Sequence, residues 1–338
     1  METAKKTQEE RGAGFRRYKT KNLVIELLPI IVLALLFAIY MTVITVRGYK
    51  MELQLTRLFN QAIVLVTVAT GATFIYALGS FDISLGASVL FACTMGVLTY
   101  NATSSVALLL LVIVACGVGC SLLSASLATF FKIPPFVTTV AMMSVLSAVA
   151  TTLININNTS GGTASITLPL NLLDPISSVW IKALIAGAFI LLCVFVFNFT
   201  KVGRRIKFLG GNPTCAKLSG IPASVYTIIA FGIAGLGVGI GALLTLAYTP
   251  SVSSGTAGSI GMNIFVAIVF GGMPISGGAK SKIYASLIGG FSYMLLNQIL
   301  LWLIGTSMNG VAQIISAALF LLIVFLTSLN YRTRLLPR

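Results

Sequence analysis

Residues 106–130 read VALLLLVIVACGVGCSLLSASLATF, a run of 25 residues without a single charged side chain. A helix of about 20 apolar residues is long enough to cross the hydrocarbon core of a bilayer. Within hydrocarbon, a helix also pairs its own backbone polar groups, which an irregular segment cannot do. Residues 106–130 therefore predict a membrane-spanning helix.

The composition of the whole chain extends this interpretation. Of its 338 residues, 57% are hydrophobic and only 9% are charged, whereas soluble proteins carry about 25% charged residues. We therefore expect an all-α polytopic membrane protein. A search for apolar stretches of spanning length gives about ten transmembrane helices. The ten stretches are 25–46, 58–79, 84–100, 106–130, 136–154, 177–199, 224–247, 262–275, 283–303 and 310–328.

These stretches also give the domain organisation. Residues 1–24 are expected to form a basic tail, residues 25–328 one transmembrane domain, and residues 329–338 a second tail. The eighth stretch, 262–275, is shorter than a full crossing of the bilayer. An even number of spans places both tails on the same side of the membrane.

Lys and Arg side chains orient the spans, because short basic loops stay on the cytoplasmic side of the membrane. With the first tail inside, ten spans place 18 of the 22 Lys and Arg residues inside as well. The exceptions are Arg47, Lys50, Arg57 and Lys182. We therefore expect both termini to be cytoplasmic. The net charge of +15 then reflects topology rather than binding to nucleic acid.

The shortage of polar catalytic groups excludes several classes of protein. After Glu52 the only acidic residues are Asp82 and Asp174, the chain has no His, and its five cysteines form no Cys-x-x-Cys pair. We therefore expect no catalytic residues, no metal site and no bound cofactor. Each extramembrane segment is shorter than 25 residues, whereas a folded domain needs about 50. An energy source or a soluble receptor must therefore be another polypeptide.

The second and third spans are separated by a glycine-bounded segment, Gly79-Ser-Phe-Asp-Ile-Ser-Leu-Gly86. Asp82 or Ser84 is suited to cap the amino end of the following helix, and the glycines allow a sharp break in the chain. A broken helix is also typical of segments beside a solute path. Asp82 is therefore a candidate for both roles, and the two are compatible.

Polar residues in the fifth and ninth spans are further candidates for a translocation path. Ser144, Ser147, Thr151 and Asn155 recur at spacings of three, four and four, so they share one face of a helix. This face either lines a wet path for a hydroxyl-rich solute or forms a packing seam between helices. Asn297 in the ninth span raises the same choice, because an amide in hydrocarbon needs a partner.

The inner segment 200–223 contains the signals of a short helix. Asn212 is placed to cap it, Pro213 to occupy its first turn, and Gly220 to follow its end. A short, capped, basic helix of this kind suits a docking element for another protein, or an interfacial helix lying on anionic lipid. Residues Ala216, Lys217 and Leu218 lie within it. Separately, the Gly235-x-Gly-x-Gly-x-Gly241 pattern in the seventh span favours close helix packing.

These motifs resemble, over essentially the whole chain, the permease subunits of the ribose, galactose and related monosaccharide ABC importers. Residues 81–86 are similar to the family's Ile-Asp-Leu-Ser-x-Gly stretch, and residues 133–139 to its Ile-Pro-x-Phe-Ile-x-Thr stretch. Residues 210–221 are similar to its Gly-Gly-Asn-x-x-Ala-Arg-Leu-Ser-Gly-Ile segment. Residues 267–278 parallel its paired-glycine pattern. Phe81 for Ile, Lys217 for Arg, and Met273-Pro274 depart from these patterns.

The resemblance implies a type II ABC importer-like permease fold in a bacterial cell membrane. It implies a homodimer, cytoplasmic ABC ATPase subunits that bind the ATP and magnesium, and an extracytoplasmic sugar-binding protein, in addition to membrane lipid. The ATPase-coupling helix would then comprise Asn212, Pro213, Ala216, Lys217, Leu218 and Gly220. A second cytoplasmic contact would lie at Gly271, Gly272, Gly277 and Gly278.

Two alternatives to monosaccharide import stay open at this point. The same family includes permeases for nucleosides and other small solutes, so the resemblance does not fix the solute. In a different class, an ion-coupled secondary transporter would need ion sites within the membrane, for which Asp82 is the only acidic candidate.

Overall fold

The computed structural model describes residues 27–158, 164–169, 172–256 and 260–304, together with seven single residues between 311 and 325. These residues form the predicted all-α polytopic architecture. The helices are Leu27–Arg47, α2 (Met51–Ala77), α3 (Leu85–Thr103), α4 (Val106–Phe130), α5 (Pro135–Ile156), α6 (Asp174–Ser177), α7 (Val179–Phe199), α8 (Lys201–Gly211), α9 (Pro213–Leu218), α10 (Ala223–Tyr248), α11 (Ile260–Phe270) and α12 (Tyr284–Ile304). Among the described residues, eight helices are long and apolar enough to span a membrane.

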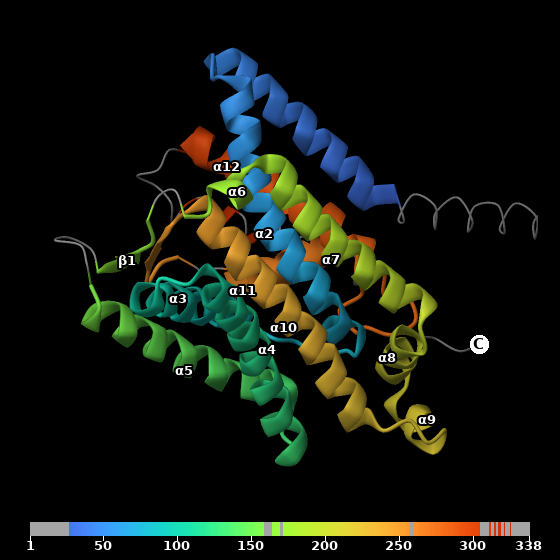
Figure 1. Cartoon of the computed structure of the whole chain (residues 1–338). Coiled ribbons are helices and arrows are strands. Elements are labelled where there is room, and N and C mark those ends of the chain that lie inside the picture. The colour runs from blue at the N-terminus through green and yellow to red at the C-terminus, as the bar shows by residue number, and fades with distance from the viewer. Residues whose placement is uncertain are drawn as a thin grey trace, which may run out of the picture.

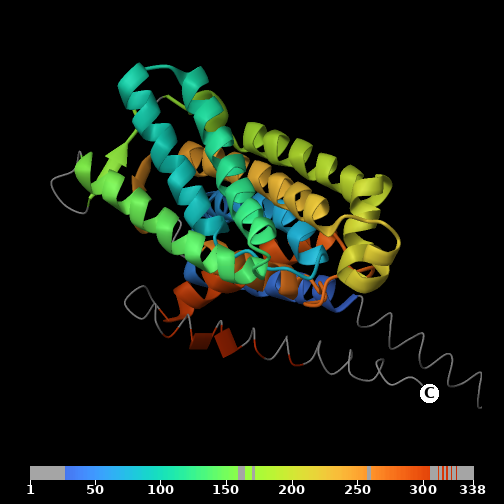
Figure 2. The ribbon, with the colours of Figure 1, turned by 90° about the horizontal axis from the view of Figure 1, so that it is seen from below.

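Helix α2 is the centre of the molecule. Nineteen of its 27 residues are buried, and from Ala62 to Ala77 every residue is buried. Figure 1 shows α2 running through the middle, with α7 and α10 beside it and with α3, α4 and α5 grouped together. In Figure 2 the N-terminal helix, Leu27–Arg47, and α12 lie together on one side. Their contact is apolar, because Leu36, Tyr40 and Ile44 pack against Leu295, Leu296 and Ile299.

Small residues let the backbones of α4 and α10 come into direct contact where the two helices cross. A Cβ atom on Gly117 of α4 would lie 2.6 Å from the backbone N of Gly239, and one on Gly235 would lie 2.7 Å from Val118 Cα. A Cβ on Gly239 would lie 2.8 Å from Val114 Cα. The glycine pattern of α10 therefore serves helix packing, as the sequence indicated.

Most predicted spans match the structure within a few residues, and the fourth matches at both ends. Helix α2 begins seven residues before the predicted 58–79, because Glu52 and Arg57 are exposed on its surface and do not interrupt it. Helix α11 is shorter than the predicted 262–275: the chain turns at Gly272, whose φ is +82°. The predicted span 310–328 lies largely outside the described residues.

Two short strands pair at the opposite end of α10 from α9. Strand β1 (Ser165–Thr167) lies antiparallel to β2 (Ser251–Ser253), with Ile166 opposite Val252. Both of these apolar side chains are fully buried. The pairing joins the segments after α5 and after α10, both of which the sequence analysis places on the outer side.

The α4–α10 crossing predicts opposite effects for two alanine substitutions on α4. Gly117→Ala would push a methyl group into the α10 backbone, at an overpacking cost of about 1–3 kcal/mol. A Cβ on Gly119 would meet nothing within 4 Å, so Gly119→Ala gains about 1 kcal/mol of helix propensity. In thermal unfolding of the detergent-solubilised protein, we expect a lower Tm for Gly117→Ala and an unchanged or higher Tm for Gly119→Ala. Equal shifts in the two variants would contradict the described crossing.

Candidate functional site

The short helix predicted in the inner segment is present as α9. The Asn212 side-chain oxygen accepts a hydrogen bond from the backbone N–H of Cys215 at 3.0 Å, which caps the helix, and Pro213 is its first residue. Gly220 follows with a φ of +74°, a conformation that favours glycine. Start and stop signals in the sequence therefore correspond to the observed ends of α9.

Helix α9 is attached by one side chain and exposes the others. Ala216 is fully buried in the main hydrophobic core. Leu218 is 84% exposed, and Pro213 and Lys217 are exposed as well. An exposed leucine beside an exposed lysine is a surface that a partner protein can cover.

Helix α8, which was not predicted from the sequence, fixes α9 to the helical bundle. Its buried residues Gly203, Ile206 and Leu209 recur every third position. Arg205 Nη1 donates a hydrogen bond to the Tyr226 hydroxyl of α10. Figure 1 shows α8 and α9 together at one end of α10.

Lys207 joins α8 to the end of α7. Its Nζ atom lies 4.0 Å from the centre of the Phe197 ring and donates to Asn198 Oδ1 at 3.2 Å. Burial lowers the pKa of Lys207 below its ordinary value. The aromatic ring and the amide are the partners that this half-buried cation finds in the described residues.

Three segments meet backbone to backbone beside α9, in an arrangement that we call the glycine junction: residues 77–79, 210–211 and 276–278. The Gly278 N–H donates to the Ala77 carbonyl oxygen at 2.9 Å. A Cβ on Gly210 would overlap the same Ala77 oxygen, and one on Gly277 would lie 2.5 Å from Gly79 N. Gly277 and Gly278 have φ values of +66° and +87°. Only glycine fits these positions.

The four glycines predicted as a second cytoplasmic contact are placed differently from one another. Gly271, Gly277 and Gly278 are buried against other parts of the chain, and Gly272 is exposed. A partner that reached this segment would meet exposed neighbours such as Ser276 and Ala279. The role of these glycines in a partner contact stays a prediction.

The polar stripe of α5 lies on its outward face. Ser144 and Asn155 are exposed, and Ser147 and Thr151 are half-buried. The buried face of α5 consists of Thr138, Thr139, Leu146, Ala150 and Ile154. The stripe is therefore not the main seam between α5 and its neighbours in this chain, and its place on a translocation path stays a prediction.

The six path candidates do not form one cluster. Asp82 is fully buried at the start of α3. Helix α5 packs on α3 and α4, whereas α12, which contains the half-buried Asn297, packs on α11 and α2. The structure thus separates Asn297 from the α5 stripe.

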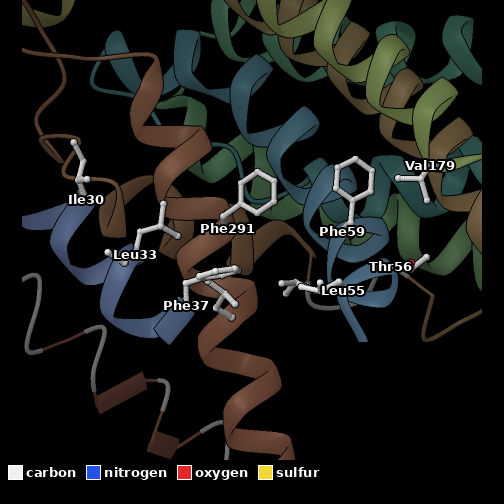
Figure 3. A pocket seen from close by; sticks show the side chains of 11 residues that line it. Ile30, Leu33, Phe37, Leu55, Thr56, Phe59, Val179 and Phe291 are labelled. Atoms are coloured by element: carbon white, nitrogen blue, oxygen red, sulfur yellow. The ribbon is translucent and has the colours of Figure 1, made fainter. Parts of the chain in front are cut away.

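An apolar pocket of about 630 Å³ lies between the N-terminal helix, α2 and α12. Figure 3 shows side chains of the N-terminal helix, among them Leu33 and Phe37, facing Leu55 and Phe59 of α2 and Phe291 of α12. Thr56 is the polar residue of this lining. The pocket therefore lacks the several polar groups that would orient a polar solute.

Within the part of the chain that the structure describes, no group of three His, Cys, Asp or Glu side chains is placed to hold a metal ion.

Residues 54–324 match the family described as the permease component of the branched-chain amino acid transport system. The chain belongs to this permease family. It is therefore a multi-pass transport component of a membrane.

Two curated relatives indicate which permeases this one is similar to. The ribose import permease protein RbsC of Escherichia coli (strain K12) is 27% identical over 324 residues, which cover 91% of this permease and 95% of RbsC. The autoinducer 2 import system permease protein LsrD of Escherichia coli (strain K12) is 28% identical over 260 residues, covering 75% and 76% of the two chains. No solved structure matches the permease.

Two features of this site escaped the sequence analysis. Helix α8 has a visible signal, since Gly203, Ile206 and Leu209 share a face and the cations lie off it. The glycine junction has a weaker one: pairs of glycines mark close approach, but their spacing does not indicate which segment approaches.

The glycine junction predicts unequal effects for neighbouring substitutions in this permease. Gly210→Ala would place a methyl group on the Ala77 oxygen, whereas a Cβ on Gly211 has its nearest neighbours at 3.9 Å. We expect Gly210→Ala to lower the Tm of the detergent-solubilised permease, by an overpacking cost of about 1–3 kcal/mol. Gly211→Ala is the matched control and should leave the Tm nearly unchanged. Tolerance of both would mean that the three segments do not meet as described.

Proposed function

We propose that this permease is the membrane-spanning subunit of a binding-protein-dependent ABC importer for a small polar solute, most specifically a monosaccharide such as ribose. The observation that carries the solute class is the similarity to a ribose import permease over nearly the full length of both chains. The observation that carries the coupling to a partner is α9, with Ala216 buried and Leu218 exposed.

The proposed complex contains two copies of the permease, cytoplasmic ATPase subunits and an extracytoplasmic sugar-binding protein. ATP and magnesium bind to the ATPase subunits. The permease lies in a bacterial cell membrane with both termini cytoplasmic. Internal contacts support this topology: the glycine junction joins three segments that the charge pattern places inside, and the β1–β2 pair joins two segments that it places outside.

Coupling would proceed from α9 through the glycine junction. Closure of the ATPases would displace α9, whose cap residue Asn212 directly follows Gly211 of the junction. Backbones in direct contact transmit a displacement with little loss, because no flexible side chain lies between them. The junction ends α2 at Ala77, so the motion reaches the break between α2 and α3.

The energy source separates this proposal from an ion-coupled transporter. The permease is reconstituted in vesicles with the ATPase and binding protein whose genes are its neighbours, and uptake of labelled ribose is measured. We expect uptake that requires ATP and persists after ionophores collapse the ion gradients. Uptake that follows an ion gradient without ATP would contradict the proposal. Uptake of a nucleoside or of leucine, measured in parallel, would identify a different solute class.

Leu218 provides the test of the ATPase contact. Leu218→Ala removes an apolar side chain that is 84% exposed, so folding should be unaffected. Loss of a buried interface anchor costs about 1–2 kcal/mol or more, so solute-stimulated ATPase activity of the complex should fall about tenfold. Trp180→Ala, at a residue that is 85% exposed on α7, is the matched control and should leave this activity intact. Equal activity in both variants would remove Leu218 from the contact.

A further inference from the structure

Three buried polar atoms near the break between α2 and α3 (residues 78–84) have no hydrogen-bond partner among the described residues. They are Asp82 Oδ2, the Tyr76 hydroxyl and the Ser88 hydroxyl. Asp82 is 0% exposed, Tyr76 3% and Ser88 1%. Buried polar groups in proteins are nearly always paired, so three unpaired ones around one break require an explanation.

The turn before α3 accounts for only one oxygen of the Asp82 carboxylate. Its Oδ1 atom accepts hydrogen bonds from the Ser84 N–H at 2.8 Å and the Ser84 hydroxyl at 2.6 Å. These bonds form the turn that precedes α3, but they do not cap the helix as predicted: Ser84 is the N-cap residue, and no described side chain accepts a hydrogen bond from the first turn of α3. An asparagine side chain would supply the same acceptor without a charge. The second carboxylate oxygen is therefore not needed for the local fold.

An aromatic cluster adjoins these polar atoms. The rings of Tyr76, Phe81 and Phe265 form a closed triangle, with centroid distances of 5.4 Å, 5.4 Å and 6.0 Å. Phe81 immediately precedes Asp82, and Phe81 and Phe265 are only half-buried. The cluster thus extends from the buried polar atoms toward the surface of the chain.

Helix α11 brings Phe265 to this place. A Cβ on Gly261 would overlap the Ile83 carbonyl oxygen, so the start of α11 packs directly on the break. With 11 residues α11 is too short to cross a bilayer. Short and interrupted helices that meet in this way are typical of solute sites in transporters.

We propose that Asp82 Oδ2 and the hydroxyls of Tyr76 and Ser88, bordered by the rings of Phe81 and Phe265, form a contact site for the hydroxyl groups of a transported sugar. An ionised carboxylate accepts the O–H donors of a sugar, and the Tyr and Ser hydroxyls donate or accept as required. Aromatic faces pack against the apolar C–H face of a sugar ring. The site is closed in this structure, and it rests on the proposed function as a sugar importer.

The experiment uses the reconstituted complex and measures the maximal rate of labelled ribose uptake with the binding protein saturated. Asp82→Asn keeps the Ser84 acceptor and removes the free carboxylate oxygen. Tyr76→Phe removes only an unpartnered hydroxyl, so a purely structural role predicts an unchanged or higher Tm and unchanged uptake. We expect both variants to keep the wild-type Tm. Uptake should fall about tenfold for Asp82→Asn, the loss of one charge-assisted hydrogen bond.

Gln54→Leu is the matched control, since Gln54 Oε1 is also buried and unpartnered but lies 22 residues before Tyr76, near the other end of α2. It should transport ribose at the wild-type rate. Wild-type uptake in both Asp82→Asn and Tyr76→Phe would overturn the site while leaving the importer function intact. If Asp82→Asn fails to fold, ribose uptake by the Tyr76→Phe variant alone tests the site. A wild-type permease that imports only solutes without hydroxyl groups would overturn the sugar assignment and this site together.

Discussion

The rest of the structure depends on the direct approach of three backbone segments at the glycine junction. The last carbonyl groups of a helix have no donor within the helix, so where they are buried they must find donors elsewhere in the protein. Here the last residue of α2, Ala77, receives the N–H of Gly278, which lies about 200 residues further along the chain. Such an approach excludes side chains, and this explains why glycines occupy these positions.

The junction also connects α2, the most buried of the eight spanning helices, to the segment that leads to the exposed helix α9. Its residues from Ala62 to Ala77 pack on all sides, which makes it a rigid rod within the bundle. One end of that rod touches the segment that leads through Asn212 into α9, and it continues directly into the break that contains Asp82. The C-terminal end of α2 therefore lies beside both the segment that leads into α9 and the break that contains Asp82.

The sequence allowed most spans to be predicted, because absence of charge over 20 or so residues is a direct consequence of membrane solvation. Helix α8 was not predicted, although its pattern is amphipathic: Lys201, Arg204 and Arg205 lie on its exposed face. The short helix α9 was predictable because caps act locally. The unpaired atoms at Tyr76 and Ser88 were not, since burial and the lack of a partner are tertiary properties.

One apparent exception to the charge pattern has a structural cause. Lys182, on the predicted outer side, is only 2% exposed. Its Nζ atom donates to Asn60 Oδ1 of α2 at 2.6 Å and lies 5.9 Å from the centre of the Tyr248 ring of α10. Topology depends on exposed basic residues in loops near the ends of the spans, so a cation that joins three packed helices is not a topological signal. Without it, the predicted outer cations are confined to the turn between the N-terminal helix and α2 and to the exposed start of α2. This agrees with the proposed placement of α8 and α9 on the cytoplasmic side.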